Sequence, residues 1–307
     1  MKKKRERVRI FCGFKEDLRK SIDLYAHELF SIISQSDMDD SIEVDMYIPR
    51  LPKVLGFIPS SSNSKFSNIP ITGFWANIGN LRLRIARYVL YPILFYFNKI
   101  KINHITDHSY GHLLNFSNKS KSIITVHDLI PLLAWKGVIP HELYPKNPVL
   151  FKLSLNGLNS ADKIICVSES TKKDLLNFCK VEDKNLTVVH NGVSKKFRKF
   201  SKEEIEKARE DLGLINTNSI YILITGNQLY KNHKISFEVI SRLEKEIKKP
   251  IQLVWLGGND DLLMKFLQKF KMNRKPILFN NLSTERVIAL YNVVNFLFFP
   301  SLYEGFG

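Results

Sequence analysis

The sequence predicts an α/β protein built from two doubly wound, parallel-sheet domains. Short, nearly continuous apolar runs rich in β-branched residues recur in both halves of the 307-residue chain, as is typical of strands covered by helices on both faces. Helix-period patterns lie between these runs. A polar and basic segment, residues 194–201, separates the two series. We therefore expect one domain over residues 1–197 and a second over residues 198–307.

The first half begins with a strand and then a helix. Residues 8–12 (VRIFC) form the apolar run, and residues 21–33 place Ile22, Tyr25, Leu29 and Ile32 on one helical face. The Pro-, Ser- and Asn-rich stretch that follows, residues 49–73, favours a mobile loop. Further strands are expected at residues 122–126, 163–167 and 186–189, with Ser168 capping the helix that follows the second of these.

The second half repeats the alternation of strand and helix. Ser201 and Glu204 have the spacing of a capping box, and Gly213 is placed to end that helix after Leu212. Strands are then expected at residues 220–225, 251–256, 276–279 and 295–299.

The composition favours anionic partners and a reducing compartment. The 46 Lys and Arg against 30 Asp and Glu give a formal net charge of +16, which fits nucleotides, phosphorylated substrates, nucleic acid or an acidic membrane surface. Cys12, Cys166 and Cys179 have neither CxxC spacing nor His-rich neighbours, so they indicate neither a disulfide framework nor a zinc site. The basic N-terminus lacks the apolar region and cleavage site of a signal peptide, and we expect a cytoplasmic protein.

Residues 82–101 alternate basic residues with large apolar ones. Two interpretations fit this pattern: an amphipathic helix that lies on anionic lipid, or a core helix with solvated charged ends. The apolar run within it, residues 88–97, is too short to span a bilayer and contains Pro92.

Polar residues follow the expected strands at the edge where parallel sheets bind ligands. His127 and Asp128 come directly after residues 122–126. The imidazole has the chemistry to bond a sugar hydroxyl or a phosphate, and the carboxylate to orient the ring. A purely structural histidine fits the same pattern.

The second half carries three such strand ends. Gly226, Asn227 and Lys231 follow residues 220–225, where the glycine lets the backbone approach a ligand and the lysine supplies a point charge. An exposed lysine is the alternative. Leu282 precedes a helix that Ser283 is placed to cap. Two interpretations fit this stretch: its backbone faces a nucleobase, or it serves only the helix cap. The most specific stretch is PSLYEGFG. Its Glu304 is suited to accept hydrogen bonds from sugar hydroxyls, and Gly305 and Gly307 allow backbone amides to turn toward a phosphate.

Taken together, these stretches resemble the retaining glycosyltransferases of the GT-B fold, specifically the nucleotide-sugar-dependent group called family four. The resemblance runs over nearly the whole chain, in this order: KSIDLYAHELFSII, INHITDHSYGHLL, SIITVHDLIPLL, ADKIICVSESTKKDLL, TVVHNGV, TGNQLYKNHK and NFLFFPSLYEGFG. It implies two Rossmann-like domains and transfer of a sugar from a nucleotide diphosphate donor, with retention, to a glycan or lipid-linked acceptor.

The resemblance also implies roles for single residues. Lys231 is expected to contact the diphosphate and Glu304 the transferred sugar. The amides of Phe306 and Gly307 are expected at the phosphate or sugar, and His127 near the reacting carbon. The donor is a substrate, and neither a metal nor another cofactor is implied, because basic groups and a helix N-terminus stabilise the departing diphosphate.

The chain departs from the family pattern at three places. Lys20 and Ser21 stand where members have a glycine-rich loop, and Gln228 and Leu229 where a basic residue is common, which leaves Lys231 as the lone cation. A second glutamate that holds the ribose in family members would lie beyond Gly307. The second domain is therefore expected to be incomplete, and the 307-residue chain weakly active or inactive.

Two rival interpretations come from other classes of function. The charge fits a nucleic-acid-binding protein, but basic residues are spread over both halves and no specific nucleic-acid motif is present. A non-catalytic remnant that binds the membrane or a partner is the other. The leading hypothesis remains a transferase of surface polysaccharide biosynthesis, cytoplasmic or peripheral at the inner face of the cell membrane.

Overall fold

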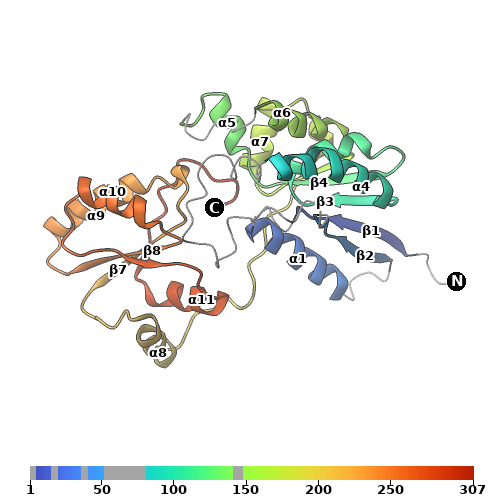
Figure 1. Cartoon of the computed structure of the whole chain (residues 1–307). Helices are drawn as coiled ribbons and strands as arrows, with labels where there is room; N and C mark the ends of the chain where they lie inside the picture. The colour runs from blue at the N-terminus through green and yellow to red at the C-terminus, as the bar shows by residue number, and fades with distance from the viewer. Residues whose placement is uncertain (1–4, 15–19, 36–40, 52–80, 141–147) are drawn as a thin grey trace. The chain divides into compact units, whose positions relative to one another are not determined.

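The structure is a computed structural model that describes residues 5–14, 20–35, 41–51, 81–140 and 148–307. The chain forms two compact units, each with its own parallel sheet (Figure 1). Unit 1 comprises Met1–Leu132, Pro145–Asn191 and Gly305–Gly307, and unit 2 comprises Leu133–Tyr144 and Gly192–Glu304. Most of the predicted loop at residues 49–73 lies outside the described residues.

Unit 1 contains a six-stranded sheet in the order β2-β1-β3-β4-β5-β6, parallel throughout. The strands are β1 (Glu6–Phe11), β2 (Ile42–Tyr47), β3 (Ile102–Ile105), β4 (Lys121–Val126), β5 (Lys163–Cys166) and β6 (Leu186–Val188). Its helices are α1 (Lys20–Gln35), η3 (Ala86–Leu90), α4 (Tyr91–Asn98), η4 (His108–Phe116), α6 (Pro148–Gly157), η6 (Leu158–Ser160), α7 (Glu169–Phe178) and η7 (Asp183–Asn185). Helix α5 (Ile130–Trp135) begins in unit 1 and ends in unit 2. Four of these strands match the predicted runs, whereas β2 and β3 were not predicted, because their polar residues interrupt the apolar pattern.

Strand β1 packs helices on both of its faces. Ile10 and Cys12 form a buried cluster with Ala26 of α1, and Phe11 places its ring 4.7 Å from that of Phe95 on α4. This alternation follows from the two-residue period of a strand. The predicted apolar face of α1 is partly wrong: Ile32 is 61% exposed, because the helix turns Ala26 toward the sheet.

Residues 81–98 are helical throughout, despite Pro92. A proline has no N–H, and its ring clashes with the carbonyl four residues earlier in a regular α-helix. The chain avoids this clash by widening the preceding turn into the π-helical segment η3, in which the N–H of Tyr91 bonds the carbonyl of Ala86. Pro92 therefore lies inside this helix.

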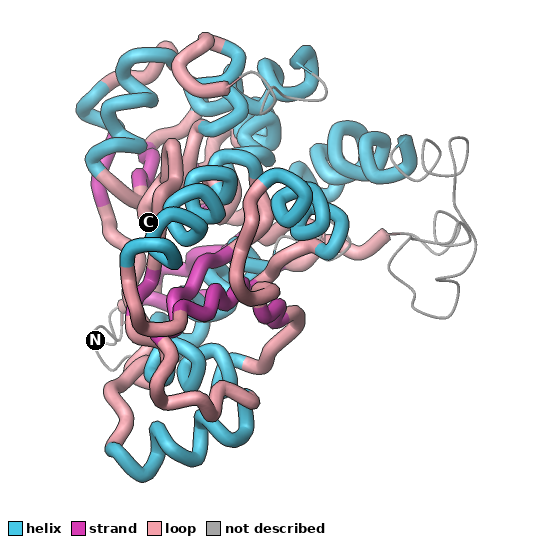
Figure 2. Tube along the Cα trace, turned by 90° about the vertical axis from the view of Figure 1, so that its left-hand side faces the viewer, coloured by secondary structure: helices cyan, strands magenta, loops and turns pink. Residues whose placement is uncertain are grey.

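Unit 2 contains a four-stranded parallel sheet in the order β10-β7-β8-β9. Helices α9 and α10 cover one face, and α8 and α11 cover the other (Figures 1 and 2). Each face has its own buried cluster, one around Leu223 and Leu290, the other around Trp255 and Phe237. The elements are α8 (Lys202–Leu212), β7 (Ile220–Thr225), η8 (Leu229–Lys231), α9 (His233–Glu246), β8 (Ile251–Leu256), α10 (Asp260–Lys269), β9 (Ile277–Phe279), α11 (Thr284–Val293) and β10 (Phe296–Leu297).

The predicted boundaries of α8 are confirmed. Ser201 and Glu204 form a reciprocal capping box, and Gly213 ends the helix in the left-handed conformation at φ 69°. Local capping chemistry alone therefore specifies both ends of this helix.

Candidate functional site

The carboxyl ends of the strands of unit 2 lie along one edge of its sheet, because the strands are parallel. The loops that follow β7 and β10 contain most of the predicted donor-binding residues. These two strands are direct neighbours, paired through Phe296 with Ile222 and Leu297 with Leu223. Residues that are some 70 positions apart in the chain, such as Lys231 and Glu304, are thereby brought together.

The turn after β7 is held rigidly at Gly226. This residue has φ 75°, a conformation that favours glycine. Its carbonyl accepts from His233 Nε2 at 2.8 Å and from Trp255 Nε1 at 2.6 Å. A Cβ at this position would lie 2.7 Å from Gln228 Oε1. Because His233 is buried, its pKa is lowered, and its role is to fix the turn.

Lys231 and Glu304 form an ion pair at this edge. Lys231 Nζ donates to Glu304 Oε1 at 2.7 Å, and the side chains are only 16% and 22% exposed. The ammonium also lies 4.5 Å from the ring centre of Phe299 and 5.5 Å from that of Tyr230, which are distances at which an aromatic face attracts a cation. The only cation expected for the diphosphate is thus oriented by a carboxylate and two aromatic rings.

Backbone bonds join the two loops that carry this pair. The N–H of Leu302 donates to the carbonyl of Tyr230 at 2.8 Å, and Asn232 Nδ2 donates to the carbonyl of Pro300 at 3.2 Å. The position of Lys231 relative to Glu304 is therefore set by main-chain contacts as well as by their charges.

Asn227 and Leu282 differ in their surroundings. Asn227 is exposed, and its N–H donates to Gln228 Oε1 at 3.3 Å. The side chain of Leu282 packs against the buried cluster around Leu223, and Ser283 caps α11 by accepting from the N–H of Arg286. Only the backbone of Leu282 is left for a ligand.

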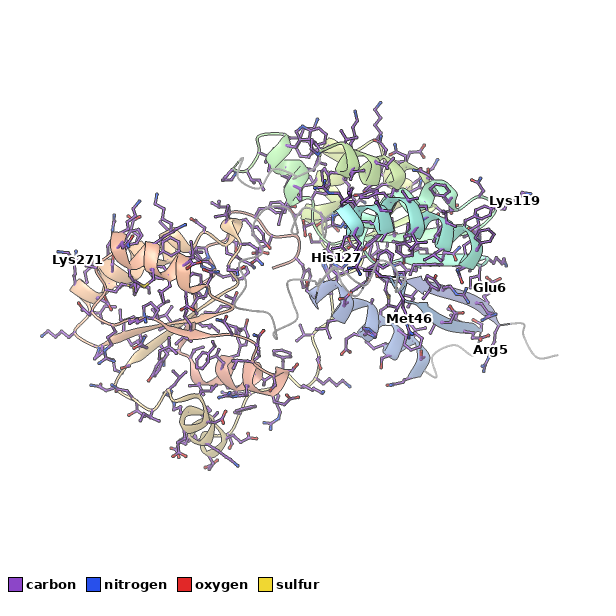
Figure 3. The ribbon with its side chains drawn as sticks, viewed as in Figure 1. Arg5, Glu6, Met46, Lys119, His127 and Lys271 are labelled. Carbon is purple, nitrogen blue, oxygen red and sulfur yellow. The ribbon has the colours of Figure 1, made fainter. Side chains whose placement is uncertain are left out.

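In unit 1, His127 follows the carboxyl end of β4 (Figure 3). Its Nε2 lies 2.9 Å from the carbonyl of Thr106. A carbonyl only accepts, so Nε2 donates this bond, and Nδ1 is the ring nitrogen left for a ligand. The rings of His127 and Tyr25 pack edge to face, with their centres 4.9 Å apart. Asp128 accepts from the N–H of Ile130 at 3.1 Å, at the start of α5.

A buried polar chain supports this strand end, and it was not predicted from the sequence. Thr125 Oγ1 lies 2.8 Å from His104 Nε2 and 3.2 Å from the hydroxyl of Tyr25. Burial lowers the pKa of His104 to about 4. The sequence signal that could have indicated these buried polar groups is the pair Asn103 and His104 between the apolar residues of INHI.

Residues 305–307 group with unit 1. Gly305 is buried, and its carbonyl accepts from Ser168 Oγ and, at 3.1 Å, from Thr171 Oγ1. A Cβ on Gly305 would lie 1.8 Å from the carbonyl oxygen of His127, so this approach requires a glycine. Ser168 also caps α7 as predicted, and the ring of Phe306 lies 5.8 Å from that of His190.

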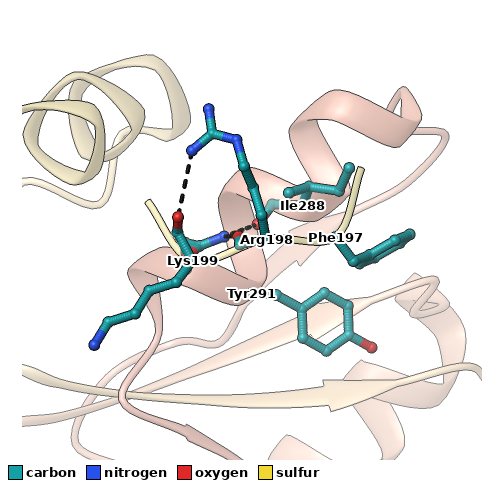
Figure 4. A pocket seen from close by; sticks show the side chains of 6 residues that line it. Phe197, Arg198, Lys199, Ile288 and Tyr291 are labelled. Atoms are coloured by element: carbon teal, nitrogen blue, oxygen red, sulfur yellow. Dashed lines mark hydrogen bonds between the residues drawn. The ribbon is translucent and has the colours of Figure 1, made fainter. Parts of the chain in front are cut away.

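A separate hollow of about 250 Å³ lies beside α11 in unit 2 (Figure 4). None of the predicted site residues lines it. Its walls are the chain at Phe197, Arg198 and Lys199, with Ile288, Tyr291 and Asn292 of α11. Asn292 is occupied there, since it donates to the carbonyl of Arg198. The candidate site is therefore the group of polar residues at the strand ends, and this hollow is separate from it.

Two kinds of feature are absent from the described ranges. Within them, no group of three or more His, Cys, Asp or Glu is placed to hold a metal ion. In the same part of the chain, no helix has both the length and the apolar content that crossing a bilayer requires.

Comparison with known proteins assigns the family. Residues 38–197 match the family model described as Glycosyltransferase Family 4, and residues 204–307 match Glycosyl transferases group 1. The chain belongs to the family 4 glycosyltransferases.

Curated relatives of this chain are similar to it over part of their length. The serotype-specific mannosyltransferase WbdA of Escherichia coli is 24% identical over 197 residues, which cover 61% of this chain and 23% of WbdA. The O-antigen chain mannosyltransferase RfbU of Salmonella typhimurium is 22% identical over 206 residues, covering 64% of this chain and 53% of RfbU. The chain thus spans between about a quarter and a half of these relatives.

Solved structures confirm the GT-B fold class of this chain. Sucrose-phosphate synthase from Thermosynechococcus elongatus superposes with a TM-score of 0.69 at 14% identity, covering 99% of this chain and 77% of that one. WaaG, a glycosyltransferase involved in lipopolysaccharide biosynthesis, gives 0.61 at 12% identity, with 97% and 76% covered. Anabaena HepE, solved in complex with UDP-glucose, gives 0.61 at 11% identity, with 94% and 72% covered.

Proposed function

We propose that this protein moves a sugar, with retention, from a nucleotide diphosphate donor to a glycan or lipid-linked acceptor in surface polysaccharide biosynthesis. The observation that carries the proposal is the ion pair of Lys231 and Glu304 at the strand ends of unit 2. The names of WbdA and RfbU, a mannosyltransferase and an O-antigen chain enzyme, support the reaction class. HepE with UDP-glucose supports the donor class.

The proposed chemistry assigns Lys231 and Glu304 to the two parts of the donor. The ammonium of Lys231 neutralises the diphosphate as its bond to the sugar breaks, and the carboxylate of Glu304 accepts from sugar hydroxyls. In the free protein these groups partner each other. Donor binding therefore exchanges one ion pair for two new interactions. The rigid turn at Gly226 keeps the backbone close to the phosphates.

The remaining site residues have supporting roles in the proposal. His127 Nδ1 accepts from a hydroxyl near the reacting carbon, Asn227 and the backbone of Leu282 contact the nucleotide, and the amides of Phe306 and Gly307 face the phosphate or sugar. Lys231 supplies the positive charge, so the proposal includes no metal and no further cofactor. We place the protein in the cytoplasm, peripheral at the inner face of the cell membrane, where lipid-linked acceptors are found.

Donor binding and transfer test the proposal in two variants. We expect Lys231→Gln to lower transfer by about 100-fold or more, because the departing diphosphate loses its cation. Lys234→Gln, an exposed lysine in the first turn of α9, is the matched control and should leave transfer unchanged. The measurements are thermal shift against a panel of uridine and guanosine diphosphate sugars, and transfer to a lipid-linked acceptor. A native chain that none of these donors stabilises would contradict the proposal.

A further inference from the structure

The helix of residues 81–98 exposes a continuous apolar surface on the side facing away from the sheet of unit 1. Its inner side is buried at Ala86, Tyr91 and Phe95, which pack toward the sheet and η4. The outer side carries six large apolar residues whose exposed fractions run from 43% to 78%. We call them the apolar stripe: Leu81, Ile85, Val89, Ile93, Tyr96 and Phe97.

The spacing of the apolar stripe makes it one surface. Its first four members follow one another at every fourth position, and Tyr96 and Phe97 come three and four positions after the last of them. Residues at these separations lie on the same helical face. A contiguous apolar strip of this kind differs from the single exposed apolar residues that are normal on a soluble protein, and it marks an interaction surface.

The segment around the stripe is uniformly basic. The sequence contains no acidic residue between Asp45 and Asp107. Eight basic residues lie in that interval: Arg50, Lys53, Lys65, Arg82, Arg84, Arg87, Lys99 and Lys101. Among the described residues, Arg84 is exposed beside the stripe.

The end of the helix combines aromatic and basic groups. The ammonium of Lys99 lies 4.4 Å from the ring centre of Tyr96 and donates to the carbonyl of Phe116. Phe97 beside it is 78% exposed, the largest fraction in the stripe. Aromatic rings next to a lysine whose stem covers apolar surface are typical of segments at the lipid–water interface.

We propose that the apolar stripe docks on the anionic surface of a phospholipid bilayer, with the helix lying in the plane of the interface. Apolar side chains then enter the boundary between head groups and acyl chains, and exposed basic groups beside the stripe, such as Arg84, meet lipid phosphates. A second copy of the chain fits less well, because it would bring two basic segments together. The proposal gives a surface to the membrane location suggested above, but it does not depend on sugar transfer.

Vesicle binding by the full chain, without donor or acceptor, tests this surface. The probe is sedimentation with vesicles of phosphatidylcholine alone or mixed with phosphatidylglycerol. We expect binding to the mixed vesicles, weakened by salt, and little to the neutral ones. Ile93→Gln with Phe97→Gln should lower the partition coefficient by about 10-fold or more, because two apolar side chains no longer enter the lipid.

A matched pair on another helix controls for loss of surface hydrophobicity. Leu24→Gln with Ile32→Gln removes two residues of α1 that are each 61% exposed, and it should leave the partition coefficient unchanged. Sedimentation velocity of all variants detects self-association. A stripe variant that loses dimer formation but keeps full vesicle binding would overturn the proposal, as would native chain that does not bind the anionic vesicles.

A conservative variant covers the case in which the double substitution disturbs folding. Phe97→Trp keeps an aromatic ring at the most exposed position, and its added fluorescence should be quenched by lipids brominated in their acyl chains. Quenching no greater than that of the native tryptophans would contradict insertion of the stripe.

Discussion

Lys231 and Glu304 hold opposite charges 2.7 Å apart in a partly buried place. We expect Glu304→Gln to release the ammonium, so that a nucleoside diphosphate without sugar binds about 2- to 5-fold more tightly, the range of a partly exposed ion pair. Transfer should fall at the same time, because the hydroxyls of the sugar lose a negatively charged hydrogen-bond acceptor. Titration calorimetry with the nucleoside diphosphate measures the first effect. Glu246→Gln, exposed at the end of α9, is the control; weaker diphosphate binding by Glu304→Gln would refute the exchange.

The buried histidines of unit 1 make its stability depend on pH. Burial lowers the pKa values of His104 and His112 to about 4, below the 6.5 of an unfolded histidine. The unfolded chain therefore binds more protons between pH 6.5 and 4, and unfolding is favoured as the pH falls through that window. Above pH 6.5 these residues contribute no pH dependence.

We expect the free energy of unfolding of unit 1 to fall by a few kcal/mol between pH 7 and pH 4.5. Urea titrations at several pH values measure this slope. His104→Gln should flatten it, whereas His27→Gln, exposed on α1, should not. An unchanged slope in His104→Gln would mean that other groups cause the acid sensitivity.

At the scale of elements, glycines set how closely η4 and α6 approach. A Cβ on Gly157 would lie 2.0 Å from the carbonyl oxygen of Gly111, and a Cβ on Gly111 would lie 2.3 Å from that of Ser154. Both obstacles are backbone atoms, so a side chain at either position must move a whole element. The contact therefore depends on the absence of side chains.

Gly157→Ala should destabilise unit 1 by about 1 to 3 kcal/mol through this overpacking. Chemical denaturation at neutral pH gives the value. Gly192→Ala has open space around its Cβ and should be nearly neutral. Equal stability of the two variants would show that α6 can shift without cost.

At the scale of the whole molecule, the two units have separate sheets and separate buried clusters. The proposed donor contacts of Lys231, Asn227 and Leu282 belong to unit 2. We expect calorimetry to resolve two unfolding transitions. A nucleotide sugar at 100 times its Kd should raise the free energy of unfolding of unit 2 by about 2.7 kcal/mol, and with it the temperature of that unit's transition. The Lys231→Gln variant identifies this transition, since its shift should be smaller. A donor that raised only the transition sensitive to His104→Gln would place the donor in unit 1 instead.

Local signals predicted much of the secondary structure. The capping box at Ser201, the stop at Gly213 and the cap at Ser168 depend on bonds between residues a few positions apart, so they are readable from short stretches. Strands β2 and β3 were missed because polar residues interrupt their apolar pattern, and both strands are held by pairing with β1, which is distant in the chain. The same limit applies to Ile32, whose apolar side chain faces solvent.

The sequence by itself determined which chemical groups follow the strands: Gly226 and Lys231 after β7, Glu304 after β10, and His127 after β4. Only the tertiary structure decided that Lys231 meets Glu304, that His104 and Tyr25 support Thr125, and that one side of the helix at 81–98 stays uncovered. The physical reason is the range of the interactions. Caps and turns form within a few residues, whereas strand order, ion pairs between loops and the choice of buried face depend on contacts summed over distant parts of the chain.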